Sequence, residues 1–264
     1  MKNLFYIMSI MLLTCSTSIA QDRSNPVVVL NFVSVDDVDL FEFYDYLAFS
    51  GEMNALRIEA GHIDFFHVWE VMHDSNPGGG VNFIIAERTS LEHTMMPPME
   101  DWQVYASNLQ AQGIESPFPQ GTYDVSKIYK SYTEIADADQ ITVYDVVNTV
   151  ADGQQINEPG WIMNMNLMLA KSPDYQSLEA QLVNLAEADI AAGGKDGWAF
   201  VGNVNGYPTD APVTHMTLDF WNGMESFLSP SSYELTSQDL ELVNDVVEAR
   251  DLRRLLRARL IIAK

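Results

Sequence analysis

The chain has 264 residues, and its 37 aspartate and glutamate residues against 14 lysine and arginine residues give a net charge of −23 at pH 7. A surface this acidic repels nucleic acid and anionic membranes, so we expect neither as a partner. The one cysteine, Cys15, excludes a disulfide framework, and the sequence has no nucleotide-binding, serine-hydrolase or zinc-protease motif.

The first 20 residues have the features of a signal peptide. Lys2 provides a positive start, Leu4–Leu13 is an apolar run too short to span a bilayer, and residues 18–20 supply the small side chains before a cleavage site. Cleavage there predicts an exported protein, periplasmic or extracellular, with no cysteine. Lipidation of Cys15 is the alternative, although Thr14 before it fits that signal poorly. No later segment is apolar for long enough to be transmembrane.

Beyond that segment the chain repeats itself. Val28–Leu91 and Met163–Gly223 follow one plan: an apolar strand, a long amphipathic segment ending at glycine, and two strands joined by a turn rich in glycine or proline. A repeat of this size indicates a duplicated domain. The aligned segments are LNFV at 30–33 with MNLM at 165–168, and VNFIIAE at 81–87 with VTHMTLD at 213–219.

Repeat one is expected at residues 21–135. Runs of β-branched and apolar residues predict its strands, and acidic starts with apolar residues at helical spacing predict its helices. The predicted strands are 27–35, 63–73, 81–87 and 125–134; the predicted helices are 36–60 and a second one that a capping box at Thr89-x-x-Glu92 opens, that Pro97-Pro98 interrupts and that resumes at 100–110. Residues 136–160 are expected to be a linker.

Repeat two is expected at residues 161–264 and copies this order. Its predicted strands are 162–169, 198–205, 213–220 and 255–262, and its predicted helices are 172–192 and 222–249, the second interrupted at Pro230. Each repeat is therefore βαββαβ, the ferredoxin-like pattern of an α+β protein. Such a sheet has helices on one face only, so we expect the two sheets to bury each other as a barrel within one monomeric chain.

This pattern resembles the dimeric α+β-barrel superfamily, which includes antibiotic-biosynthesis monooxygenases and stress-responsive A/B-barrel proteins. The resemblance is carried by LDFWNGMESFL at Leu218–Leu228 and by Asn31 and Asn166 on the first strands. It implies a barrel of two sheets, usually from two chains, and an activity such as cofactor-independent oxygenation. Haem-degrading members use a histidine in the helix after strand three, where this chain has His93; we nevertheless expect no cofactor.

Side chains alternate across a strand, so each strand presents two faces. In strand 162–169 one face is wholly apolar, and this face is predicted to pack against the helices while the polar face looks into the barrel. The same argument for the other strands predicts an inward set of Asn31, His67, Trp69, Phe83, Ile85, Glu87, Asn164, Asn166, Met168, His215, Thr217 and Asp219, with Phe66, Val68, Trp198 and Phe200 toward the helices.

These inward residues are the candidate site. His215 and Asp219 could form an acid/base pair beside Asn166, which makes these three the catalytic candidates, and the candidates for ligand binding are Asn31, His67, Trp69, Glu87, Asn164 and Thr217. The alternative is that the polar residues only hydrogen-bond one another. No metal site is expected, because His67 and His73, the two histidines on one strand face, lie about 20 Å apart by strand rise.

Three functions remain open from the sequence. The first is an exported barrel protein that binds a small, largely apolar molecule in its cavity. The second is a cofactor-independent monooxygenase-like enzyme, and the third is a structural or protein-interaction module with a filled barrel. The sequence does not decide whether there is catalysis.

Overall fold

The computed structural model describes residues 26–76, 80–90, 99–118, 121–150, 155–204 and 213–264. The predicted signal peptide, Cys15, His93 and the acidic member of the predicted capping box lie outside these residues. None of the described helices is long and apolar enough to cross a membrane.

Two halves with the same order of elements make up the described fold. The first contains β1 (Pro26–Val35), α2 (Leu40–Glu59), β2 (Phe65–Asp74), β3 (Phe83–Ser90), α3 (Met99–Ala111), α4 (Val125–Ile135) and β4 (Ala136–Val150). The second contains β5 (Ile162–Ala170), α5 (Tyr175–Gln181), α6 (Val183–Ala191), β6 (Gly197–Asn203), β7 (His215–Trp221), α7 (Met224–Leu228), α8 (Ser237–Glu248) and β8 (Arg250–Ala263).

The strands form one closed antiparallel barrel in the order β1-β3-β2-β8-β5-β7-β6-β4. Within each half the order is that of a ferredoxin-like sheet, β4-β1-β3-β2 and β8-β5-β7-β6. The halves meet at two seams, β2 with β8 and β4 with β6. The prediction of two ferredoxin-like repeats that close into a barrel within one chain is therefore confirmed.

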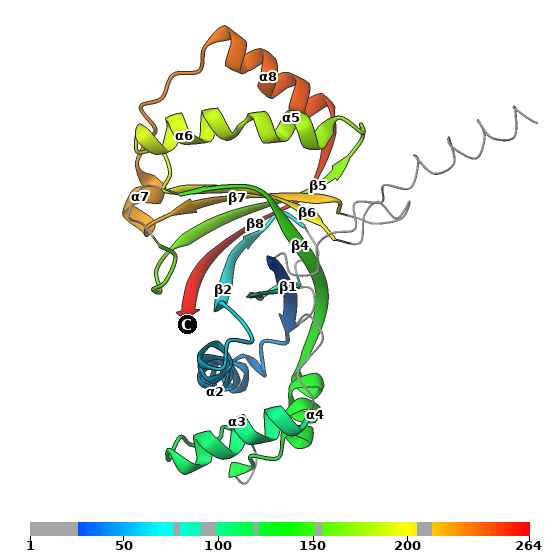
Figure 1. The fold of residues 1–264 in the computed structure, drawn as a ribbon, viewed down its shortest axis with the longest axis vertical. Helices are drawn as coiled ribbons and strands as arrows, with labels where there is room; N and C mark the ends of the chain where they lie inside the picture. Colours follow the sequence, from blue (N-terminus) through cyan, green and yellow to red (C-terminus); the bar gives the residue numbers. More distant parts are fainter. Residues whose placement is uncertain (1–25, 77–79, 91–98, 119–120, 151–154, 205–212) are drawn as a thin grey trace, which may run out of the picture.

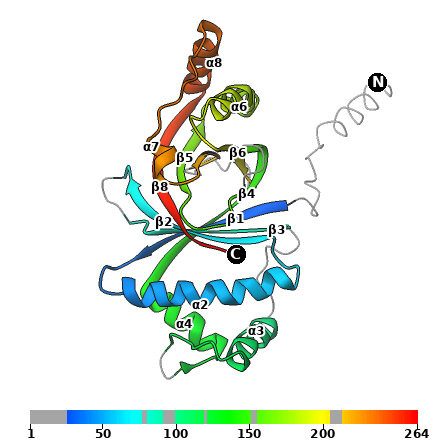
Figure 2. The same ribbon diagram turned by 90° about the vertical axis from the view of Figure 1, so that its left-hand side faces the viewer.

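Helices cover the barrel on two opposite sides. Figure 1 shows α5, α6 and α8 on one side and α2, α3 and α4 on the other, with the strands between them. Figure 2 shows the same two helical layers after a quarter turn. On the first-half side, Phe43 and Leu47 of α2 pack with Phe66 and Val68 of β2. The core therefore has four parts: the barrel interior, one helix–sheet layer on each side, and a cluster among α2, α3 and α4.

The position predicted for the fourth strand of repeat one is wrong. Residues 125–134 are helical, because Val125, Ile128, Tyr132 and Ile135 recur at helical spacing and the Asp124 carboxylate accepts hydrogen bonds from the first backbone N–H groups. The strand is β4, which occupies most of the predicted linker.

β4 joins the two halves directly. It pairs with β1 of its own half and with β6 of the other, and its register shifts between Asp145 and Val147. The Tyr144 ring lies over Gly202 of β6, where an added Cβ would come within 2.6 Å of the ring. The register shift between Asp145 and Val147 is a β-bulge, and it interrupts the alternation of apolar residues by which strands are recognised in a sequence.

The predicted capping box after strand three is also wrong. Thr89 lies within β3 and is buried, and its hydroxyl donates to the backbone carbonyl of His62 at 3.1 Å. The strand therefore continues past the point where the sequence predicts a helix start. The extension keeps Arg88 on the sheet.

Candidate functional site

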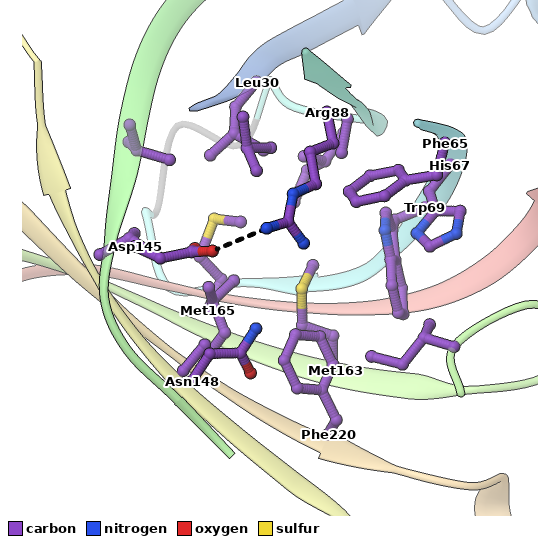
Figure 3. Close-up of a pocket in the computed structure, with 18 of the residues that line it drawn as sticks. Leu30, Phe65, His67, Trp69, Arg88, Asp145, Asn148, Met163, Met165 and Phe220 are labelled. Atoms are coloured by element: carbon purple, nitrogen blue, oxygen red, sulfur yellow. Dashed lines mark ion pairs between the residues drawn. The ribbon is translucent and has the colours of Figure 1, made fainter. Parts of the chain in front are cut away.

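A cavity of about 420 Å³ lies inside the barrel. Figure 3 shows it with the side chains that line it. Most of these are aliphatic, aromatic or methionine side chains from strands of both halves, with Ile156 from the segment before β5: Val28, Leu30, Phe65, Trp69, Ile84, Ala86, Val143, Ile156, Met163, Met165, Ala199, Val201, Leu218 and Phe220. The polar lining residues are His67, Arg88, Asp145, Asn148 and Gln155.

Strands one and three of each repeat turn inward the face opposite to the one predicted. The interior side chains of these strands are Leu30, Phe32, Ile84 and Ala86 in repeat one, and Met163, Met165, Leu167, Met216, Leu218 and Phe220 in repeat two. Most of the interior of a closed barrel is shut off from water, so it takes the more apolar face. Polar groups on the outer face can instead pair with charged side chains.

His215 therefore does not reach the cavity. It lies between the sheet and the helices, stacked on Phe200 with ring centroids 5.3 Å apart and edge-on to Tyr175 of α5 at 5.0 Å. Burial lowers the pKa of His215 to about 4. Asp219 is about 13 Å farther along the strand by strand rise, and its carboxylate lies 2.6 Å from the Lys195 ammonium. The predicted acid/base pair is wrong.

The other polar candidates of repeat two share that outer face. The Asn166 amide donates to the Thr217 hydroxyl at 3.2 Å, across β5 and β7. The Asn164 carbonyl oxygen accepts from Arg257 at 2.8 Å. Their predicted placement in the barrel is wrong. The alternative prediction, that these polar residues only hydrogen-bond one another, describes them better.

Repeat one shows the same inversion. Asn31 alternates with the interior residues of β1 and so faces outward. The Glu87 carboxylate lies 3.0 Å from the guanidinium of Arg57 of α2 and forms an ion pair with it. The Arg57 side chain is 5% exposed. These two residues thus belong to the helix–sheet layer, and neither lines the cavity.

Strand two follows the prediction in both repeats. His67 and Trp69 line the cavity, whereas Phe66 and Val68, like Trp198 and Phe200 in β6, face the helices. His67 and Trp69 are therefore the two sequence-predicted site residues that the structure brings to the cavity.

His67 is held in an apolar setting. The residue is 7% exposed, and its ring stacks on Phe65 with centroids 4.3 Å apart, with Trp69 edge-on at 6.2 Å. Burial lowers the pKa of His67 to about 4, and a hydrogen bond with the backbone of Ile156 opposes this shift only in part. The imidazole is consequently neutral near pH 7, so it can accept as well as donate a proton.

Polar groups that the sequence did not reveal gather at one end of the cavity, which we call the cavity mouth and define as Arg88, Asp145, Asn148 and Gln155. Arg88 and Asp145 are 34% and 31% exposed at their side chains, and a guanidinium nitrogen lies 3.6 Å from the carboxylate. Asp145, Asn148 and Gln155 fall in the predicted linker. The apolar residues flanking Asp145 were the signal that could have placed it on a strand.

No group of three or more His, Cys, Asp or Glu side chains in the described part of the chain is placed to hold a metal ion. The cavity has one histidine and one carboxylate, His67 and Asp145. The described lining residues can supply hydrogen bonding, apolar contact and proton transfer at His67.

No family model and no curated protein sequence matches the chain. Solved structures do. The chain has the dimeric α+β-barrel fold. A "putative monooxygenase" from Lactobacillus acidophilus is 15% identical with a TM-score of 0.50, over 90% of this chain and all of that one. A "putative monooxygenase" from Fusobacterium nucleatum is 9% identical with a TM-score of 0.55, over 91% and 94%.

A third similar structure is an anthrone oxidase-like protein, 7% identical with a TM-score of 0.52 over 92% of this chain and 94% of that one. At these identities the likeness concerns the fold, and it extends across both halves of the described barrel. What the cavity binds depends on its own side chains.

Proposed function

We propose that the protein binds a small, largely apolar molecule inside the barrel. The observation that carries this proposal is the cavity itself, whose volume of about 420 Å³ is within the range of small-molecule sites. An unfilled apolar space lowers the free energy of unfolding by about 24 cal/mol per Å³ through lost packing. A cavity of this size therefore destabilises the fold substantially unless a ligand fills it.

The lining supports an apolar ligand with a limited number of polar contacts. Met163, Met165 and Trp69 offer adaptable or aromatic surface, and His67 is the one titratable lining residue that does not belong to the mouth. Because its pKa is lowered to about 4, His67 adds no charge near pH 7 and does not penalise an uncharged ligand.

Calorimetric titration with naphthalene derivatives tests this function. Ala199 is 4% exposed and lines the cavity, so Ala199→Phe should fill the space and weaken binding by at least about ten-fold. His215→Phe is the control, because His215 lies outside the barrel wall; it should leave the affinity within about two-fold. Equal affinity in both variants would contradict binding in this cavity.

A second candidate function is oxygen-dependent oxidation of the bound molecule without a cofactor. The position of His67 beside the cavity favours it, because the imidazole can accept a proton from an activated methylene group, although the burial that lowers its pKa to about 4 also weakens it as a base. The electrons then pass to molecular oxygen. The methylene carbon loses both hydrogens and gains one oxygen atom as a carbonyl, and the second oxygen atom leaves with the two hydrogens as one water molecule. The name of the anthrone oxidase-like neighbour suggests the trial substrate.

Oxygen uptake with anthrone separates catalysis from binding. Turnover above the rate in buffer, lost in His67→Ala and retained in His215→Ala, would support the enzyme. Rates equal to buffer for the unaltered protein, together with measurable binding, would leave ligand binding as the function.

The protein performs this role as an exported monomer. The signal-peptide features of residues 1–20 support export, and the barrel seams formed within one chain support a monomer. The intact mass of the exported protein should match a chain that begins at Gln21, and light scattering should give one chain per particle. A lipid-bearing Cys15 would contradict cleavage before Gln21, and a dimer at low concentration would contradict the monomer.

A further inference from the structure

The cavity mouth contains an ion pair that is close but not hydrogen-bonded. Arg88 lies 3.6 Å from Asp145 inside the barrel and 3.8 Å from Asp64 outside it, and both distances exceed that of a good hydrogen bond. The Arg88 Nε atom is buried and has no hydrogen-bond partner among the described residues. The Arg88 Nη2 donor and the Asp145 carboxylate thus lie beside the cavity without a hydrogen bond between them, whereas the buried Nε faces Asp64.

The charge balance at this point decides what these groups can receive. One guanidinium is flanked by two carboxylates, so the local sum is −1, in a chain whose net charge is already −23. An anionic group that approached Arg88 would be repelled by Asp145, which lines the same cavity. A neutral group that both accepts from Arg88 and donates to Asp145 satisfies both without this repulsion.

The rest of the cavity fixes the orientation of the ligand. Beyond the mouth the lining is apolar apart from His67, with Met165, Ile84 and Trp69 among its members. Figure 3 shows Arg88 and Asp145 directed toward each other, while His67 and Trp69 stand together elsewhere on the wall. Polar contacts for a head group are therefore concentrated at the mouth.

We propose that the cavity selects amphipathic molecules with an uncharged head group that carries both a hydrogen-bond donor and an acceptor, such as a carboxamide or a hydroxy-carbonyl. The head group binds between Arg88 and Asp145, and the apolar body lies against the methionines and Trp69. This inference rests on the proposed binding function and names the class of ligand for it.

Four ligands with one ring body test the selectivity: 2-naphthamide, 2-naphthoate, 2-naphthylmethylammonium and 2-ethylnaphthalene, titrated calorimetrically into the full exported chain. We expect 2-naphthamide to bind about ten-fold more tightly than 2-ethylnaphthalene, because charged partners strengthen its hydrogen bonds. We expect 2-naphthoate to bind more weakly than 2-naphthamide by at least the same factor.

Two matched variants assign the selectivity to the mouth. Asp145→Asn removes the inner carboxylate and should improve 2-naphthoate binding about ten-fold, with 2-naphthamide changed less than about three-fold. Asp64→Asn removes the other partner of Arg88, which is 70% exposed and does not line the cavity, and should leave the ranking of the four ligands unchanged.

Equal affinities for all four ligands would overturn the head-group inference and leave apolar binding intact. Tightest binding of 2-naphthoate or of 2-naphthylmethylammonium would overturn it as well, by showing recognition of a charge. An equal response to Asp64→Asn and Asp145→Asn would remove the assignment to the mouth. Binding of none of the four would overturn this inference and the proposed function together.

Discussion

The two halves of the barrel interior occupy equivalent registers, and they differ in polarity or size at four pairs of equivalent positions. His67 pairs with Ala86 between β2 and β3, and Ala199 pairs with Leu218 at the matching point between β6 and β7. Along these registers the equivalent positions are His67 and Ala199, Trp69 and Val201, Arg88 and Phe220, and Asp145 and Leu260. In each pair the first-half residue is polar or a large aromatic, and the equivalent second-half residue is smaller or apolar.

This difference shows where the duplicated barrel has kept polar chemistry. The repeat-two positions supply the apolar walls of the cavity through Ala199 and Phe220, and part of the packed core through Leu260. A symmetric barrel would have two mouths or none. Here the described interior has one polar mouth, and it belongs to repeat one and β4.

Replacing each of the equivalent residues Asp145 and Leu260 by the other, in separate variants, should give the largest difference in the free energy of unfolding. Leu260 is 1% exposed in the packed part of the interior, so Leu260→Asp leaves a cavity and a buried unpaired carboxyl and should destabilise the fold by more than about 4 kcal/mol. Asp145→Leu removes a pair that is one third exposed and should cost under about 1 kcal/mol. Urea denaturation measures both, and similar costs would contradict the asymmetry.

Two of the interior alanines, Ala86 and Ala258, sharpen the comparison through packing. Ala258 is fully buried in the core cluster and does not line the cavity, so Ala258→Leu should overpack the interior and cost up to about 3 kcal/mol. Ala86 lines the cavity, and the equivalent repeat-two residue is Leu218. Ala86→Leu should therefore fold with little loss while its naphthamide affinity falls. Thermal melting and titration of both variants provide the check; equal destabilisation would argue that the cavity is not open space.

The pH dependence of stability tests His67. Its pKa is lowered to about 4 in the folded protein from 6.5, so the folded state favours the neutral ring. The unfolded chain takes up the proton first as pH falls, so this stability is present above pH 6.5 and is lost between 6.5 and about 4. Between pH 7.5 and 4.5 the loss should be about 2 kcal/mol.

His67→Gln should lose less of its stability over that pH range than the unaltered protein does. His215 has the same lowered pKa in the opposite setting, behind the sheet, so its variant controls for histidine burial in general. Addition of 2-naphthamide should shift the pH profile of the His215 variant but not that of Ala199→Phe. An unchanged pH slope in His67→Gln would show that the ring is not held neutral.

The sequence by itself determined the repeat, the ferredoxin-like order and the faces of β2 and β6. Apolar and β-branched runs, glycine turns and the spacing of the two copies were enough for these features, because they depend on local periodicity. It also placed His67 and Trp69 in the interior. The prediction failed at 125–150. Residues 125–135 form a helix although their apolar residues resemble a strand, and the bulge beside Asp145 hides the alternation of β4.

Only the tertiary structure decided which face of β1, β3, β5 and β7 is inside. Alternation states which residues share a face, and Asn166, His215 and Asp219 are predicted inward because their face is the more polar. Whether a face is interior depends on what packs against it. The closed interior takes the apolar face, while ion pairs such as Arg57 with Glu87 make the polar face tolerable under the helices. The approach of Arg88 to Asp145 depends likewise on tertiary pairing, because β3 and β4 both pair with β1 and so bring together residues that lie far apart in the chain.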